Sequence, residues 1–360
     1  MTVAVKPQFF ALSPPEMDEI FVSWGWPAFR GQQVRQWVYE KLTCEPQKMT
    51  NLAQPDRQKL AENIDLQVGQ ILKHQISSDG THKILAGWEA GAAAESVIIP
   101  DGRRLTACVS SQVGCPVGCK FCASGVNGLK QNLSADRIVQ QIFLLNRILL
   151  RRKQRINHVV FMGMGEPLAN YANLIRAIKI LHDPQCFNLG ARKITVSTVG
   201  VPSRMRQLAN ENLQLNLAIS LHAPDETLRR QLIPWAEHFS LDDILQAARY
   251  YFERTGREIT LEYILLSGVN DSVPQAKRLA KICKSMRANV NLIRYNEVEG
   301  LPFERPRSEA VMNFQNALRQ QGVNAHVRKS RGRDIDAACG QLRRRAQTPA
   351  GAAAGTEVEP

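Results

Sequence analysis

Residues 105–122 read LTACVSSQVGCPVGCKFC, a short apolar strand followed at once by a loop that carries three cysteines. Cys115, Cys119 and Cys122 have the spacing C-x3-C-x2-C. Three thiolates suit an iron–sulfur cubane that keeps one iron free to bind a substrate. Structural zinc usually takes four closed ligands. Cys108 could be the fourth, so the spacing by itself leaves zinc as an alternative to a cluster.

Short apolar runs alternate with amphipathic helical stretches after this loop. Such alternation is typical of parallel strands joined by crossover helices. About six such units predict an α/β fold with a partial (β/α)6 barrel, and barrel active sites gather at the strand end where the cysteine loop begins. The expected strands are 105–110, 158–164, 193–198, 215–221, 258–266, 290–295 and 324–330; the expected helices are 134–152, 171–183, 201–211, 241–256, 273–287 and 308–322.

Four segments follow from these patterns. Residues 1–75 are expected to be helical because Val34, Trp37 and Val38 recur at helical spacing. Residues 76–104 contain Asp-Gly turns between short apolar runs, and residues 346–360 are of low complexity. The predicted segments are a small N-terminal helical accessory domain (1–75), a β-hairpin extension (76–104), the partial barrel domain that carries the cysteine loop (105–345) and a disordered tail (346–360).

The composition is that of a globular protein with a basic surface. Of 360 residues, 44% are hydrophobic and 22% are charged, which is ordinary for a chain with a packed core. No segment approaches the roughly 18 apolar residues of a membrane span, and we see no secretory signal, so we expect a cytoplasmic protein without a membrane partner. The net charge of +13 fits a solvated basic surface or a polyanionic partner, most simply nucleic acid, and two basic clusters at 151–155 and 328–345 favour the latter.

Small polar groups stand at the predicted ends of several strands. The GMGEP turn (163–167) allows close backbone approach, and its carboxylate could accept hydrogen bonds from an ammonium group. No single one of these residues is specific evidence for a binding site, and a lone histidine at a strand end is more often structural than catalytic. Together they are what a barrel active site needs at one rim. They are Glu166, Ser197, Thr198, Ser220, His222 and Asn296.

The remaining candidates carry weaker signals. Cys339 lies between two small residues, where a thiol is commonly inert, although such a setting would suit a thiol that moves between two positions. Glu95 begins a short strand and by itself reads as a surface carboxylate. We do not expect disulfides of a structural framework in a cytosolic chain of this size. Three further cysteines have no cysteine close to them in sequence, and we expect them to be buried and without a functional role: Cys44, Cys186 and Cys283.

Several separated motifs, in order, resemble one known family. They are CVSSQVGCPVGCKFCASG, GMGEP, ITVSTVG, LAISLHAP, NLIRYN and VRKSRGRDIDAACGQL. Together they are similar to the RlmN/Cfr family of radical S-adenosylmethionine RNA methyltransferases, over roughly residues 20–345. That family has a partial (β/α)6 radical-SAM barrel, an N-terminal accessory domain and a 4Fe-4S cluster. The resemblance therefore implies an enzyme with the fold that the alternation predicts.

The resemblance also implies a role for each candidate. Cys339 would take a methyl group from one S-adenosyl-L-methionine, and a radical from a second would activate that methyl to add to adenine. Cys108 would release the product by forming a disulfide with Cys339, and Glu95 would accept a proton. A thiolate is needed because the electrophilic adenine carbon cannot attack a sulfonium methyl. The implied cluster ligands are Cys115, Cys119 and Cys122, and the implied S-adenosyl-L-methionine contacts are Gly165, Glu166, Ser197, Ser220, Leu221, His222 and Asn296.

Two reactions compete within this family. RlmN members methylate carbon 2 of an adenosine in 23S rRNA, at the peptidyl transferase centre, and of the adenosine 3′ of the anticodon in tRNA. Cfr members methylate carbon 8 of the same rRNA adenosine. Pro167 and the VRKSRG segment favour RlmN, whereas NLIRYN and GLKQNL lean towards Cfr. We expect a carbon-2 enzyme with RNA and an electron donor such as flavodoxin as partners; the alternatives are a carbon-8 enzyme and a non-catalytic zinc RNA-binding protein.

Overall fold

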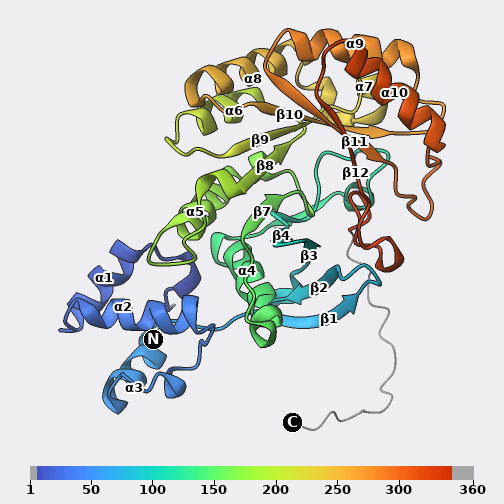
Figure 1. The fold of residues 1–360 in the computed structure, drawn as a ribbon. Coiled ribbons are helices and arrows are strands. Elements are labelled where there is room, and N and C mark those ends of the chain that lie inside the picture. The colour runs from blue at the N-terminus through green and yellow to red at the C-terminus, as the bar shows by residue number, and fades with distance from the viewer. Residues whose placement is uncertain (1–5, 343–360) are drawn as a thin grey trace.

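One large mixed sheet organises the protein in the computed structural model, which describes residues 6–342 (Figure 1). The strand order is β1-β2-β3-β4-β7-β8-β9-β10-β11-β12, antiparallel from β1 to β4 and parallel from β4 to β12. Because β1 and β12 are its two ends, the barrel is open. The strands are β1 (Gln70–Ile76), β2 (His82–Gly87), β3 (Ala93–Asp101), β4 (Arg104–Cys108), β7 (His158–Phe161), β8 (Ile194–Thr198), β9 (Asn216–Ser220), β10 (Ile259–Leu265), β11 (Ala288–Arg294) and β12 (Ala325–Arg328).

The crossover helices cover the outer face of the parallel strands (Figure 1). Side chains alternate between the two faces of each strand, so every second residue points into the barrel. The sequence-predicted partial (β/α)6 barrel is therefore confirmed, with β12 added after the sixth unit. The helices are α4 (Ala135–Leu149), α5 (Tyr171–His182), α6 (Pro202–Ala209), α8 (Leu241–Thr255), α9 (Val273–Lys284) and α10 (Ser308–Gln320); the short α7 (Glu226–Leu232) follows β9.

Helix α8 illustrates why these stretches are helical. The hydroxyl of Ser240 accepts a hydrogen bond from the backbone N–H of Asp243 at 3.1 Å, which caps the first turn. Gly256, with φ +68°, ends the helix in the left-handed region that glycine adopts without strain. Between these ends the buried residues recur at helical spacing and pack on the sheet. They are Leu241, Ile244, Ala247, Ala248 and Tyr251.

The N-terminal helices pack against α4 and α5 of the barrel. They are α1 (Pro14–Ser23), α2 (Phe29–Arg35), which continues as a π-helical turn (Gln36–Glu40), and α3 (Gln54–Asn63). The rings of Phe10 and Phe143 meet edge to face with centroids 5.1 Å apart. Arg176 of α5 pairs with Glu16 of α1 at 2.6 Å. The helical accessory domain is thus attached to the barrel by both apolar and ionic contacts.

Three elements differ from the sequence-based expectation. Strand β1 lies inside the segment expected to be helical, so the extension before the barrel has three antiparallel strands, β1 to β3, in place of a single hairpin. Most of β1 is exposed, which is why its sequence lacks apolar alternation. The short hairpin of β5 (Gln112–Gly114) and β6 (Leu129–Asn132) was also not predicted. The tail predicted to be disordered, 346–360, lies outside the described residues. None of the helices between residues 6 and 342 has the length and apolarity needed to cross a bilayer.

Candidate active site

The cysteine loop lies between β5 and β6 at the carboxyl ends of the barrel strands. Gly114 (φ +78°) closes this hairpin: a Cβ atom there would stand 2.0 Å from the carbonyl oxygen of Gly128. The backbone N–H of Cys115 donates to that same carbonyl at 3.1 Å. On its other side the loop is fixed to the end of α7, since the N–H of Lys120 donates to the carbonyl of Leu232 at 2.9 Å. The hairpin therefore holds the three cysteines at one end of the barrel.

A cavity of about 140 Å³ brings most of the predicted site residues together. It lies between the cysteine loop and the ends of β7 to β10. Its lining includes all three cysteines of the loop and also Cys339, which is more than 200 residues away along the chain. Leu221, Asn296, Cys108 and Glu95 are not among the lining residues. The predicted residues that do line it are Cys115, Cys119, Cys122, Gly165, Glu166, Ser197, Thr198, Ser220, His222 and Cys339.

The loop that carries Cys339 is anchored directly to the cysteine loop. The N–H of Ala123 donates to the carbonyl of Gly340 at 2.8 Å, and the hydroxyl of Ser124 donates to the carbonyl of Leu342 at 2.6 Å. The amide of Asn296 donates to the carbonyl of Cys339 itself at 3.3 Å. Asn296 therefore positions the Cys339 backbone from outside the cavity.

Glu166 and His222 are buried and fixed by backbone hydrogen bonds. The carboxylate of Glu166 accepts from the N–H groups of Leu168 and Val199, both at 2.9 Å. Burial raises the pKa of Glu166 to about 7, against the effect of these hydrogen bonds. Nδ1 of His222 accepts from the N–H of Ile264 at 3.1 Å, and burial, with the nearby Arg229 charge, lowers the pKa of His222 to about 3. His222 is therefore a neutral imidazole with its proton on Nε2.

Cys108 and Cys339 belong to one electrostatic neighbourhood. Burial raises the pKa of Cys108 to about 12, and the Cys339 thiol adds to this shift. Burial also raises the pKa of Cys339, and the Arg328 guanidinium opposes the shift at both cysteines. Arg328 is itself paired with the carboxylate of Glu262, 3.5 Å away. The two thiols thus share a cation although they come from opposite ends of the barrel domain.

Glu95 and Leu221 do not line the cavity. Glu95 is on β3, where Val97 is opposite Cys108 of β4, so both cysteine and carboxylate point to the same face of the sheet. The carboxylate of Glu95 forms a buried ion pair with Lys83. Leu221 is fully buried, and its N–H donates to the carbonyl of Glu262 at 3.1 Å. Leu221 therefore holds the end of β9 through its backbone.

The cysteine loop fits an iron–sulfur cluster better than a single ion. Cys115, Cys119 and Cys122 border one cavity and are packed in an apolar cluster with Val117 and Phe121. Within residues 6–342, no three His, Cys, Asp or Glu side chains converge closely enough to enclose one metal ion. Cys108, the fourth ligand that a zinc site would need, does not line the cavity. Three thiols around a shared space suit a cubane, which is wider than one ion.

Sequence analysis missed the roles of three charged residues at this site, two of which are buried. Glu262 lines the cavity and is 3% exposed, and Arg229 is 1% exposed. Arg328 was noted only as part of a basic cluster. A signal existed for Glu262, because a carboxylate in the middle of the apolar strand EITLEYILL needs a partner once it is buried. No comparable signal marked Arg229, which looks like any other charge on a short helix.

Comparisons with known proteins agree with this geometry. Residues 109–280 match the radical SAM superfamily model, and residues 8–66 match the ribosomal RNA large subunit methyltransferase N-terminal domain. A protein of Dictyoglomus turgidum named "Probable dual-specificity RNA methyltransferase RlmN" is 43% identical over 91% of this chain and 94% of its own length. A protein of Thermotoga maritima with the same name is 43% identical over 92% and 96%.

A solved structure is similar over nearly the whole chain. The crystal structure of a radical SAM methyltransferase from Sphaerobacter thermophilus superposes with a TM-score of 0.91 and 40% identity, over 94% of this chain and 99% of the other. Likeness of this extent includes both the accessory domain and the barrel, and it argues against the non-catalytic zinc protein. The chain belongs to the RlmN/Cfr family of radical S-adenosylmethionine RNA methyltransferases, is most like RlmN, and is an enzyme.

Proposed function

We propose that this enzyme methylates carbon 2 of one adenosine in 23S rRNA, at the peptidyl transferase centre, and of the adenosine 3′ of the anticodon in tRNA. The observation that carries the proposal is the contact between the two cysteine-bearing loops, in which Ala123 donates to Gly340. It puts Cys339 and the three loop cysteines around one cavity. The RlmN relatives, whose names describe dual specificity, support the choice of two RNA substrates.

The cofactors would be a 4Fe-4S cluster and S-adenosyl-L-methionine. Cys115, Cys119 and Cys122 would hold the cluster, which when bound supplies the electron that cleaves S-adenosyl-L-methionine to a 5′-deoxyadenosyl radical. The surrounding strand ends would orient the substrate molecule and keep water out. An electron donor such as flavodoxin would provide the electron. The proposed contacts to S-adenosyl-L-methionine are Gly165, Glu166, Ser197, Ser220 and His222, which line the cavity, with Leu221 and Asn296, which do not line it, as two further proposed contacts.

Cys339 would carry the methyl group to the RNA. The target carbon of adenine is electrophilic and cannot displace a methyl group from a sulfonium, whereas a thiolate is a good nucleophile for that displacement. The positive charge of Arg328, which opposes the rise in the pKa of Cys339, favours the thiolate. Asn296 would keep the sulfur facing the cavity through its hydrogen bond to the Cys339 carbonyl.

Cys108 and Glu95 would release the product. The radical would first remove one hydrogen atom from the methyl group, and the remaining methylene carbon would join the adenine. The resulting radical adduct would then give one electron to the oxidised cluster, and Glu95 would accept the proton lost from the target carbon. The Cys108 sulfur would then attack the Cys339 sulfur, so that a disulfide forms and the sulfur–carbon bond to the RNA breaks. The electron pair of that bond would stay on the carbon, which takes a proton to become the methyl group. A reductant would return the disulfide to two thiols.

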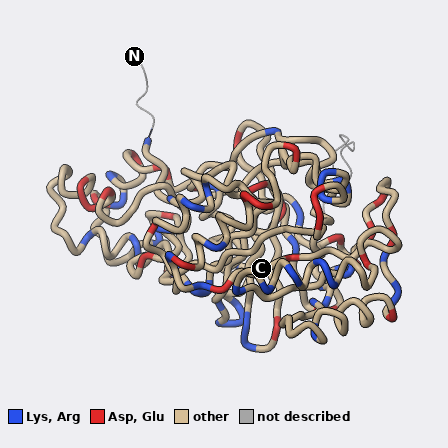
Figure 2. The backbone as a smooth tube through the Cα atoms, turned by 90° about the horizontal axis from the view of Figure 1, so that it is seen from above, with Lys and Arg blue, Asp and Glu red and all other residues tan. Residues whose placement is uncertain are grey.

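A second, larger cavity supports RNA as the substrate. It has a volume of about 690 Å³, lies towards the opposite end of the strands, and shares Met162 and Glu262 with the cofactor cavity. Its cations outnumber its carboxylates: Arg328 and Arg331 are paired with Glu262 and Asp101, and the lining also includes Arg104 and Lys329. A flipped-out nucleotide fits such a volume, and the excess positive charge suits its phosphates. Lysines and arginines are also spread over the rest of the molecule, interleaved with acidic residues (Figure 2).

Iron analysis and cofactor cleavage test the proposal together. Anaerobically purified protein is expected to be brown, with about four irons per chain, and to cleave S-adenosyl-L-methionine when reduced. Cys119→Ala should abolish both properties, whereas the distant Cys44→Ala should leave them unchanged. A colourless protein that contains zinc and does not cleave S-adenosyl-L-methionine would contradict the proposal.

A further inference from the structure

Arg229 is a buried cation without a matching carboxylate. Its side chain is 1% exposed and is one of the largest fully buried side chains in the described residues. Nη2 donates to the carbonyl of Val199 at 2.5 Å, but Nε and Nη1 have no hydrogen-bond partner among the residues that the structure describes. Among residues 6–342, no acidic side chain lies within 4.0 Å of its guanidinium, whereas the neighbouring Arg230 is exposed and pairs with Glu226.

Such a side chain is costly unless an anion lies beside it. A charge removed from water loses far more free energy than a neutral group, and proteins therefore pair buried charges or give them a bound ion. Arginine cannot escape this cost by losing its proton. Glu226, which acts on Arg229 electrostatically, does not reach ion-pair distance. Residues 6–342 therefore leave the positive charge of Arg229 largely uncompensated.

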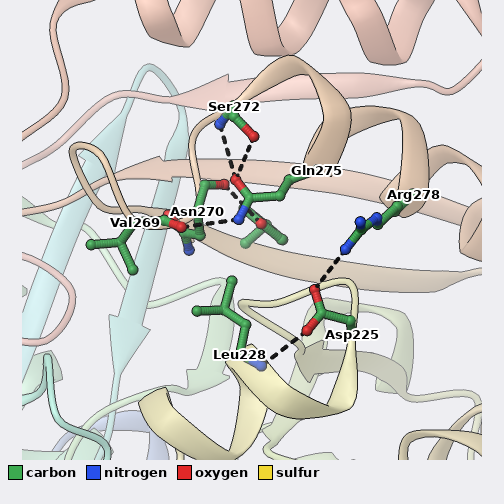
Figure 3. Close-up of polar contacts among 8 residues, drawn as sticks. Asp225, Leu228, Val269, Asn270, Ser272, Gln275 and Arg278 are labelled. Atoms are coloured by element: carbon green, nitrogen blue, oxygen red, sulfur yellow. Dashed lines mark hydrogen bonds and ion pairs between the residues drawn. The ribbon is translucent and has the colours of Figure 1, made fainter.

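The position of Arg229 is fixed by the start of α7. The carboxylate of Asp225 accepts from the N–H of Leu228 at 2.9 Å and pairs with Arg278 of α9 at 3.4 Å (Figure 3). The same close-up shows Asn270 in the segment that precedes α9 (Figure 3), and its amide donates to the carbonyl of His222 at 2.8 Å. These contacts hold α7 in one place, and the fixed helix restricts the position of the Arg229 guanidinium.

The groups beside Arg229 belong to the cofactor site. The N–H of Lys120, the residue after Cys119, donates to the carbonyl of Leu232 on the helix that carries Arg229. The Arg229 charge acts on Cys119 and on the imidazole of His222. The acceptor of its one hydrogen bond, Val199, lines the cofactor cavity. Apolar side chains from α7 and the turn after it, Leu232, Ile233 and Ala236, pack with Val117 and Phe121 and exclude water from this region. A neutral imidazole does not compensate a cation, so the anion must come from the cysteine side.

We propose that Arg229 supplies a fixed positive charge to the iron–sulfur group held by Cys119 and thereby raises its midpoint potential. This inference rests on the proposed cluster. When the oxidised cluster takes one electron from a donor, its negative charge increases by one while Arg229 remains a guanidinium. A cation in a water-excluded site stabilises the more negative state. Nε and Nη1 are also available as hydrogen-bond donors, and both charge and hydrogen bonds to sulfur set the potentials of such clusters.

Potentiometric titration followed by electron paramagnetic resonance tests this role without measuring activity. The reconstituted full-length chain is titrated first without S-adenosyl-L-methionine. In Arg229→Met we expect the ratio of reduced to oxidised cluster at a fixed potential to fall about tenfold, which corresponds to about 59 mV for one electron. Arg229→Lys should keep most of the wild-type potential, and Arg230→Met, the exposed neighbour, should be unchanged.

Two further measurements separate the charge from other roles. Arg229→Gln retains a donor for the Val199 carbonyl and should shift as far as Arg229→Met; a wild-type potential in Arg229→Gln would overturn the inference, since it would assign the effect to that hydrogen bond. A shift seen only after S-adenosyl-L-methionine is added would also overturn it, because Arg229 would then serve that ligand. If Arg229→Met loses iron, the midpoint potentials of Arg229→Lys and Arg229→Gln can still be compared, and this comparison shows whether the positive charge sets the potential. Wild-type protein without a cluster would instead contradict the proposed function.

Discussion

The ammonium group of Lys83 lies 3.1 Å from the carboxylate of Glu95, and both side chains are buried on neighbouring strands, β2 and β3. Lys83 also donates to the carbonyl of Asp336 at 3.1 Å, three residues before Cys339. One cation therefore connects the proposed proton acceptor with the loop that would carry the methyl group.

Replacing Lys83 should slow product release more than methyl loading. A positioned base contributes about 10²–10⁴-fold to a rate, so losing its partner in Lys83→Met should prolong the protein–RNA adduct at least about tenfold. Adduct lifetime can be followed on denaturing gels, and Cys339 methylation by mass spectrometry. Lys83→Arg keeps the charge and controls for instability, and Lys73→Met changes an exposed lysine on β1. An adduct lifetime equal to that of the wild type would refute the positioning role.

Cys108→Ala should trap the covalent protein–RNA adduct. Without the second thiol nothing can attack the Cys339 sulfur, so the sulfur–carbon bond to the RNA should persist. The readout is a band that contains both protein and RNA after denaturation, with a mass that includes one methylene bridge. Cys283→Ala changes another buried cysteine and should leave no adduct. Cluster-containing Cys108→Ala that turns over normally would argue against the two-cysteine scheme.

Gly165→Ala should impair cofactor binding through the backbone. Gly165 has φ +106°, and a Cβ atom there would stand 2.6 Å from the Cβ of Gln112 and 2.8 Å from the hydroxyl of Ser111. Such strain costs about 1–3 kcal/mol and would displace the neighbouring Glu166. We expect the affinity for S-adenosyl-L-methionine, measured by equilibrium dialysis, to fall by roughly tenfold or more. Gly190→Ala, at φ −57° and with no atom within 4 Å of the new Cβ, is the matched control.

Glu16 should make stability depend on pH in the acid range. Burial opposes the ionisation of Glu16, but the hydrogen bonds from Arg176 and Ser13, together with the Arg176 charge, outweigh it and lower the pKa of Glu16 from 4.5 to about 2. Because the folded pKa is the lower one, the ionised carboxylate stabilises the protein above pH 4.5, and this contribution is lost as the pH falls towards 2.

Urea unfolding of Glu16→Gln measures that contribution. Glutamine keeps the capping arrangement at the start of α1 but removes the ion pair to α5. Since the pair is partly exposed, the variant should lose about 1 kcal/mol or less near pH 7, and the difference should vanish as the pH approaches 2. Glu45→Gln removes an exposed pair with Lys48 and is the control. A difference that is the same at every pH would exclude the ion pair as its source.

The barrel was predictable from sequence because its strands and helices carry strong apolar patterns. Helix α8 has buried residues at every helical repeat, and β9 and β10 are almost continuously buried. Strand β1 was missed because it lies at the edge of the sheet and is mostly exposed, so no alternation marks it. Its pairing with β2 depends on the tertiary structure and not on its own sequence.

The site was predictable residue by residue but not as a geometry. The spacing of the three cysteines and the small polar groups at strand ends indicated one rim, and the structure brings ten of the candidates named from sequence to one cavity. The contact between Ala123 and Gly340, which joins loops over 200 residues apart, has no local sequence signal. The same is true of Arg229, whose burial only the packed structure reveals.

The nucleoside product tests the central claim most directly. RNA that contains 23S rRNA and tRNA is incubated with the reconstituted enzyme, a reductant and S-adenosyl-L-methionine labelled in its methyl group, then digested and analysed by mass spectrometry. We predict labelled 2-methyladenosine from both RNAs, and none from Cys339→Ala protein that retains its cluster. Labelled 8-methyladenosine, or labelled 2-methyladenosine from Cys339→Ala, would contradict the account.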